Sequence, residues 1–189
     1  LLDPNRIYTL QTSDFSLLNP NTKTCPTFRT SRDAELTAKI YRNCGHIIEN
    51  EKTGDNPWKI KFGSMFNMST DSHLFRTYGH LIEAGASLDG NIFTMRDGTI
   101  YMPLYEGKMI WHYNHHYGTW PTNGERPNTI DCPSLAEMQD SSSTLMPWYW
   151  VPKSEVENNL TAKGWNSKFI LAFRDITNAS TERTFIVAG

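Results

Sequence analysis

Apolar residues recur with a helical period in two parts of the chain, and both parts carry signals for helix ends. Thr30 and Asp33 have the spacing of a capping box, and Gly45 can end a helix, so we expect a helix over residues 31–43. A second apolar stripe, preceded by polar cap residues and followed by a glycine, predicts a helix over residues 71–84. The helical part of the fold should therefore consist of short to medium helices.

Strand signals are strongest after the second predicted helix. Asp97-Gly98 is a hairpin-turn sequence, and the apolar runs on either side of it predict strands over residues 92–95 and 99–104. Another strand is expected over residues 108–113. Shorter signals predict strands at residues 58–62, 148–151, 168–173 and 184–188, and a short helix from residue 154 to residue 160.

Proline and turn-forming residues define the segments between these elements. Three prolines interrupt the first 30 residues: Pro4, Pro20 and Pro26. We therefore expect residues 1–30 to be a connecting arm with short strands such as 7–10. Residues 121–143 should form a long surface loop with at most a short helix near 135–139. Residues 31–189 then form an α+β segment whose sheet is mixed and mainly antiparallel.

Composition narrows the class of protein. The 189 residues include 12% aromatics, which excludes a disordered chain, and no window is apolar over the ~18 residues that a membrane span needs. The net charge of −2 is unusual for an autonomous nucleic-acid-binding domain. Residues 23–42 nevertheless hold five basic against two acidic side chains, which suits either a solvated helix face or a phosphate contact.

The cysteines and the two ends of the chain lead us to expect a piece of a larger intracellular protein. Cys25, Cys44 and Cys132 are odd in number and form no CxxC pair, so free thiols in a reduced cytoplasm are expected rather than disulfides. The chain starts without Met or a signal peptide, and it ends in an apolar, strand-like run. We therefore expect it to be a piece of a larger protein without a complete active site of its own.

Asp97, Glu106 and Lys108 are the first candidates for chemistry. A hairpin carrying an Asp, followed by Glu-x-Lys, is the skeleton of many metal-dependent nucleases, in which two carboxylates hold a divalent ion and Lys positions water. The alternative is structural, because Asp97 is also the residue that favours an Asp-Gly turn and Glu-x-Lys is a common string.

His112, His115 and His116 are the second set. Three histidines within five residues can bind zinc, but neighbouring side chains on an extended strand point to opposite faces, and no cysteine is close by. A wet surface of aromatic and imidazole rings, suited to stacking or to phosphate contacts, fits the sequence better than a metal site. Plain packing is the remaining interpretation.

Four arginines near loops or helix ends are the third set: Arg29, Arg32, Arg174 and Arg183. Guanidinium groups in such places meet phosphate oxygens or base edges, although ion pairs with Asp33, Asp175 and Glu182 are the structural alternative. The chain has no Walker-type loop, no GxSxG and no HExxH motif. It therefore offers no nucleotide or S-adenosylmethionine pocket of a known sequence pattern.

Four segments in series carry a resemblance. They contain TCPTFR (24–29) with RDAELT (32–37), SHLFRT (72–77), PLYEGKMI (103–110) with the histidine-rich run to residue 119, and FRDI (173–176) with TERT (181–184). Residues 19–188 together resemble the region after the methyltransferase core in large bacterial adenine-specific DNA methyltransferases. These enzymes belong to the fused type IIG restriction–modification systems and the BREX phage-exclusion systems.

The resemblance implies a parent enzyme of the bacterial cytoplasm that moves a methyl group from S-adenosylmethionine to the amino group of a flipped-out adenine. The family's Asn-Pro-Pro-aromatic motif and its glycine motif are missing, and Asn19-Pro20-Asn21 does not replace the former. We therefore expect no catalytic residue, metal or cofactor in this piece, and as partners double-stranded DNA and an upstream methyltransferase core. DNA contacts are expected at Arg29, Arg32, Lys108, His112, His115, His116, Arg174 and Arg183.

Within that set, residues 105–119 are the segment expected to face DNA or the pocket of the flipped base. His116 occupies a position at which much of the family has a basic Arg, so the contact implied there differs in charge.

Overall fold

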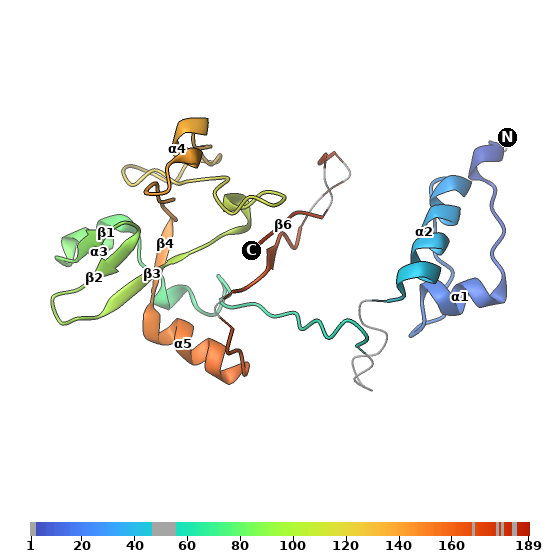
Figure 1. The fold of residues 1–189 in the computed structure, drawn as a ribbon, viewed down its shortest axis with the longest axis horizontal. Coiled ribbons are helices and arrows are strands. Elements are labelled where there is room, and N and C mark those ends of the chain that lie inside the picture. Colours follow the sequence, from blue (N-terminus) through green and yellow to red (C-terminus); the bar gives the residue numbers. More distant parts are fainter. Residues whose placement is uncertain (1–2, 47–55, 168, 177, 179, 183–184) are drawn as a thin grey trace. The chain divides into compact units, whose positions relative to one another are not determined.

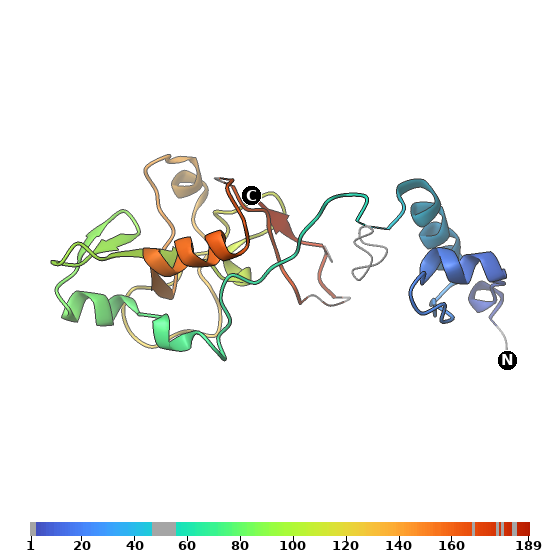
Figure 2. The same ribbon diagram turned by 90° about the horizontal axis from the view of Figure 1, so that it is seen from below.

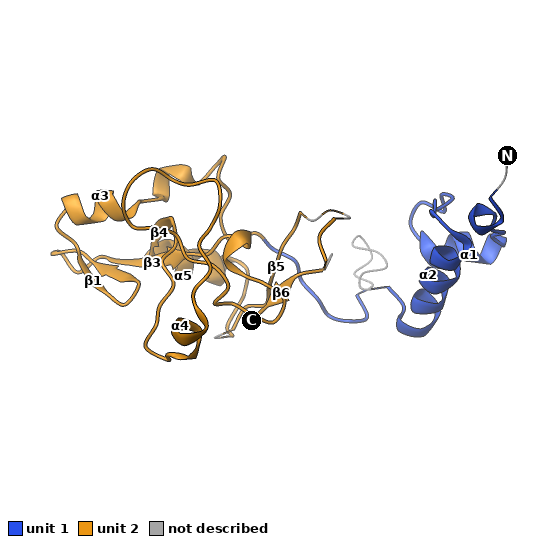
Figure 3. Cartoon of the chain, turned by 90° about the horizontal axis from the view of Figure 1, so that it is seen from above, with its two compact units in different colours: residues 1–63 blue, residues 64–189 orange. Residues whose placement is uncertain are grey.

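The computed structural model describes residues 3–46, 56–167, 169–176, 178, 180–182 and 185–189. Contacts among these residues divide the chain into unit 1, residues 1–63, and unit 2, residues 64–189 (Figure 3). The sequence suggested a boundary after residue 30, whereas the contact boundary follows Gly63. The two units are described separately.

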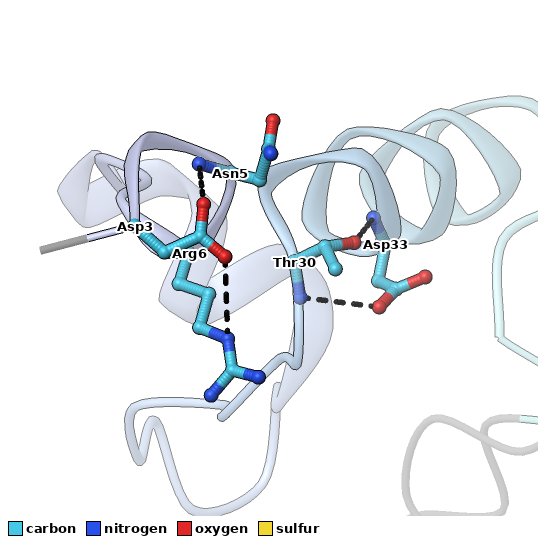
Figure 4. Close-up of polar contacts among 5 residues, drawn as sticks. All are labelled: Asp3, Asn5, Arg6, Thr30 and Asp33. Carbon is cyan, nitrogen blue, oxygen red and sulfur yellow. Dashed lines mark hydrogen bonds and ion pairs between the residues drawn. The ribbon is translucent and has the colours of Figure 1, made fainter.

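Unit 1 is helical. It contains the 3-10 helix η1 (Pro4–Arg6) and the helices α1 (Thr12–Leu18) and α2 (Ser31–Cys44) (Figure 1). The capping box that predicted α2 is formed, since the Asp33 amide donates to the Thr30 hydroxyl and the Thr30 amide donates to the Asp33 carboxylate (Figure 4). Gly45 follows with φ of +67°, a conformation that glycine adopts without strain.

Helices α1 and α2 pack against each other. Because α1 lies within the first 30 residues, this segment belongs to the same unit as α2. Asp14 of α1 is buried, and one of its oxygens accepts a hydrogen bond of 2.8 Å from Arg42 of α2. Leu18, Ala34 and Ala38 are buried between the two helices. Because a charged carboxylate is costly to bury alone, the Arg42 pair helps to fix the register of α1 against α2.

Two short strands expected in unit 1 are not formed. Residues 7–10 run outside any strand, and Tyr8 instead packs its ring edge-to-face on Phe28 with centroids 5.5 Å apart. Within residues 58–62 the backbone turns, since the Asn56 side chain accepts a hydrogen bond from the Ile60 amide and Lys59 has a positive φ of 53°. Alternation alone cannot make a strand where no neighbouring strand pairs with it.

Unit 2 contains a four-stranded antiparallel sheet in the order β1-β2-β3-β4. Its strands are β1 (Ser87–Asp89), β2 (Ile92–Thr94), β3 (Ile100–Leu104) and β4 (Tyr149–Pro152). The predicted hairpin joins β2 to β3, with Gly98 at φ of +88°. Helix α5 (Lys153–Ala162) packs on β3 and β4 (Figure 2), and α3 is Tyr78–Glu83. The expected α+β class is confirmed.

Short elements complete unit 2. They are the 3-10 helices η2 (Ser72–Leu74) and η3 (Gly107–Met109), the helix α4 (Leu135–Gln139), and a separate pair of antiparallel strands, β5 (Ala172–Phe173) and β6 (Val187–Ala188). Helix α4 lies inside the long loop, as the sequence predicted. Among the described residues, no helix combines the length and apolar character needed to cross a bilayer.

Two hydrophobic clusters lie inside unit 2. The first consists of Leu81, Phe93 and Trp150, and the Trp150 indole nitrogen donates to the Asn91 carbonyl at 2.7 Å. The second consists of Met109, Trp120 and Leu145. Burying such large side chains contributes about 1.5–3 kcal/mol for each of them, so these clusters hold the sheet and the long connections together.

Two predictions for unit 2 were wrong, and long-range contacts explain both. The helix expected over 71–84 is interrupted because Arg76 pairs with Trp150, exchanging backbone hydrogen bonds of 2.9 and 2.8 Å. The strand expected over 108–113 is replaced by η3 and a tight turn. Met109 is fully buried there, and its carbonyl accepts hydrogen bonds from the Tyr117 and Gly118 amides.

Candidate nucleic-acid interface

Residues 105–119, which we call the 105–119 loop, form a folded projection after β3. Its tip is a turn in which Trp111 and Asn114 exchange two backbone hydrogen bonds of 2.7 and 2.9 Å. Tyr113 lies within this turn at φ of +59°, and its amide donates to the Val187 carbonyl of β6 at 2.8 Å. The tip is therefore fixed by hydrogen bonds although it lies outside the main sheet.

Arg174 holds this loop through hydrogen bonds and contacts with aromatic rings. Its Nε and Nη2 atoms donate to the Ile110 carbonyl at 3.1 and 2.6 Å. Its guanidinium lies 4.9 Å from the ring of Trp111 and 5.8 Å from that of Tyr117, and these two rings are stacked on each other. Arg174, expected from the sequence to contact DNA, thus positions the loop that carries Lys108 and the three candidate histidines.

A second arginine, Arg126, fixes the base of the loop. Its guanidinium forms an ion pair with Glu106 and lies over three aromatic rings, at 4.5 Å from Trp120, 5.7 Å from Trp148 and 5.6 Å from Tyr149. These five residues are called the Arg126 cluster. Sequence reasoning did not find Arg126, because it lies in the turn-rich loop and three of its four partners, Glu106, Trp148 and Tyr149, are about 20 residues away.

Two polar atoms of the Arg126 cluster are buried without a hydrogen-bond partner among the described residues. They are Oε1 of Glu106 and Nε1 of Trp120. Lys108, the neighbour of this cluster, donates from Nζ to the Asn128 carbonyl at 3.1 Å and lies 5.7 Å from the Trp120 ring. Lys108 is consequently held beside the cluster, while its residue as a whole remains exposed.

The exposed side of the 105–119 loop carries aromatic and imidazole rings. Tyr113 is 83% exposed, and its ring centroid lies 4.0 Å from that of His112. The His115 and His116 rings are 4.4 Å apart in an edge-to-face arrangement. Such rings offer faces for stacking and nitrogen atoms for hydrogen bonds, which is the chemistry that unpaired bases use.

The His116 side chain differs from a permanently charged side chain such as arginine because its pKa is lowered. Burial, and then the neighbouring His115, lower the pKa of His116 below its ordinary value of 6.5. At neutral pH this imidazole is therefore mostly uncharged, and it can donate and accept hydrogen bonds but supplies little charge to a phosphate.

The nuclease candidates are not brought together. Asp97 lies in the β2–β3 turn and accepts a hydrogen bond from the Thr99 amide, which lowers the pKa of its carboxyl. Glu106 follows the other end of β3 and is paired with Arg126. The five residues of β3 alone span about 13 Å at ~3.3 Å per residue. Among the described residues, no group of three His, Cys, Asp or Glu side chains is arranged to hold a metal ion.

Of the other three candidate arginines, two belong to unit 1 and one lies outside the described residues. Arg29 and Arg32 are both exposed at the start of α2, and Arg32 approaches Glu35 at 3.9 Å. Asp33, a possible ion-pair partner, instead serves the capping box. Arg183 lies outside the described residues.

No protein-family model, no curated protein and no solved structure matches this chain.

Proposed function

We propose that the chain is a non-catalytic DNA-binding and target-recognition segment of an adenine-specific DNA methyltransferase. The observation that carries this proposal is the 105–119 loop, which is fastened by Arg174 and the Arg126 cluster and carries Tyr113 83% exposed. An exposed aromatic ring on a rigid support is costly to keep in water, and it stacks on a base with little loss of side-chain entropy.

The loop combines the two kinds of contact that DNA recognition needs. The Tyr113 ring, with His112 beside it, supplies a stacking face for a base that has left the duplex. Lys108 and His115, on either side of the tip, supply donors for phosphate oxygens and fix the position of the strand. In this proposal Arg29 and Arg32 add phosphate contacts from unit 1.

The proposed parent enzyme works in the bacterial cytoplasm, and its upstream core binds S-adenosylmethionine and performs methyl transfer. We assign no residue of this chain to the cofactor. Exposed apolar side chains of unit 2 suit a surface that the core would cover, since such side chains gather at protein interfaces. They include Phe169, Leu171, Ile176 and Phe185.

The test compares this chain with a longer protein that includes the upstream core. The longer protein should methylate adenine in duplex DNA, and this chain alone should not. In the longer protein, Tyr113→Ala should raise KM for DNA more than it lowers kcat, because the ring binds DNA but does not touch the methyl donor.

The matched control is Tyr113→Phe, which keeps the ring and should keep KM. Absence of methylation by the longer protein, or magnesium-dependent cleavage by this chain that is lost in Glu106→Ala, would contradict the proposal.

A further inference from the structure

Unit 1 contains a pocket of about 440 Å³ lined by Arg6, Phe28 and Arg29. Arg6 ends η1, and the other two residues directly precede the cap of α2. The volume lies within the ~300–1,000 Å³ of typical small-ligand sites. Two arginines and one phenylalanine thus line a concave surface of suitable size.

The frame around this pocket is held by contacts that leave its charged groups accessible. The Phe28 amide donates to the Tyr8 hydroxyl at 3.0 Å, and the two rings pack edge-to-face. Asp3 accepts a hydrogen bond from the Asn5 amide at 3.0 Å and approaches Arg6 at 3.7 Å (Figure 4). Two of the three lining residues, Phe28 and Arg6, are therefore each held by a contact with a neighbouring side chain.

The charges around the pocket leave room for an anion. The Arg6–Asp3 pair is long, and its side chains are 75% and 50% exposed, so water screens it and a ligand can compete with it. Arg29 forms no ion pair within the part of the chain that the structure describes. The nearby carboxylate of Asp33 already accepts the Thr30 amide. Of the two arginines that line the pocket, only Arg6 has a described ion pair, and that pair competes weakly with a ligand.

We propose that this pocket binds a nucleotide, with its phosphate between Arg6 and Arg29 and its base against the Phe28 ring. Guanidinium groups match phosphate oxygens with paired hydrogen bonds, and aromatic rings stack on bases of any sequence. The nucleotide is either free or one unit of a nucleic-acid strand. The inference rests on the proposed function only in the second case, where it gives Arg29 a defined role.

Isothermal titration of the full chain with inorganic phosphate and with adenosine monophosphate tests the pocket. The nucleotide should bind more tightly than phosphate, and Phe28→Leu should remove this difference while leaving phosphate binding in place. Arg29→Ala should weaken nucleotide binding about tenfold, the effect of losing one charge-assisted contact. Lys39→Ala is the matched control, since Lys39 is an exposed basic residue of α2 that does not line the pocket, and it should bind as the wild type does.

A variant that strengthens binding guards against effects of misfolding. Asp3→Asn keeps an oxygen for the Asn5 amide but removes the charge beside Arg6, so it should tighten nucleotide binding up to about fivefold. Equal affinity for phosphate and the nucleotide, no binding of either, or equal losses in Arg29→Ala and Lys39→Ala would overturn the proposal.

A short single-stranded oligonucleotide distinguishes the two sources of the nucleotide. Tighter binding of the strand than of the monophosphate, lost in Arg29→Ala, indicates a nucleic-acid strand, and the reverse order indicates a free nucleotide. If Arg29→Ala has no effect on any ligand while Tyr113→Ala weakens DNA binding, this inference fails and the proposed function stands.

Discussion

Arg126 lies over three aromatic rings and pairs with Glu106, so Arg126→Ala removes several contacts in one change. The side chains of the ion pair are only 32% and 24% exposed, which places it between surface pairs, worth about 0.2–1 kcal/mol, and buried pairs, whose breaking costs about 3–5 kcal/mol. The cation–π contact, closest to Trp120 at 4.5 Å, adds about 0.5–2 kcal/mol. We expect a total loss of about 2–4 kcal/mol in the free energy of unfolding.

The buried oxygen of Glu106 adds to this cost. Oε1 already lacks a hydrogen-bond partner among the residues that the structure describes, so removal of Arg126 would leave a half-buried carboxylate without its counter-charge. In a double-mutant cycle, Glu106→Gln should therefore cost less in the Arg126→Ala background than in the wild type, with a coupling energy of at least ~1 kcal/mol.

Urea unfolding followed by tryptophan fluorescence measures both quantities. Of the six tryptophans only Trp58 belongs to unit 1, so the signal reports mainly on unit 2. Lys153→Ala is the control, because its pair with Glu157 at 3.7 Å is exposed and its loss should cost about 0.5 kcal/mol or less. A loss in Arg126→Ala no larger than in this control would refute the reasoning.

Three other predictions concern the 105–119 loop. Because the pKa of His116 is lowered in the folded state, its contribution to stability is fully present above pH ~6.5 and is lost as the pH falls below that value. An NMR titration should give a pKa below 6.5 for His116. In His116→Asn, the free energy of unfolding should fall less steeply as the pH is lowered from ~6.5. Gly118→Ala places a Cβ 2.8 Å from Cδ1 of Ile130, so it should destabilise by about 1–3 kcal/mol in urea unfolding, with partial recovery in the Ile130→Val double variant. Arg174→Lys should lower amide-exchange protection at Tyr113, because Lys cannot donate twice to the Ile110 carbonyl while lying on Trp111 and Tyr117; unchanged exchange would show that the loop does not depend on this fork.

The sequence predicted best those elements whose determinants are local. The capping box of Thr30 and Asp33 and the Asp97-Gly98 turn each lie within a few residues of the element they start or join, and both predictions were confirmed. The helix expected over 71–84 instead depends on a distant partner, Trp150 of β4, which draws Arg76 into a bridge. No local pattern carries that information.

The candidate site shows the same division. The sequence singled out Glu106, Lys108 and Arg174; the first two lie in the 105–119 loop, and Arg174 is hydrogen-bonded to it. It gave no sign that Arg126 would join Glu106, because the signal is an aromatic surface assembled from Trp120 and the distant residues 148–149. The sequence shows the aromatic residues at 120 and 148–149, but it does not show that Arg126 lies over their rings.

DNA binding by the chain itself tests the central claim most directly. Fluorescence anisotropy with a labelled duplex that carries one unpaired adenine, measured between about 50 and 200 mM salt, gives both the affinity and its salt dependence. We predict weak binding with a logarithmic slope near −3, as expected for about three phosphate contacts from Lys108, Arg29 and Arg32, and a loss of at least about fivefold in Tyr113→Ala but not in Tyr113→Phe. No binding, equal binding by Tyr113→Ala, or tight sequence-specific binding by this chain alone would contradict the account.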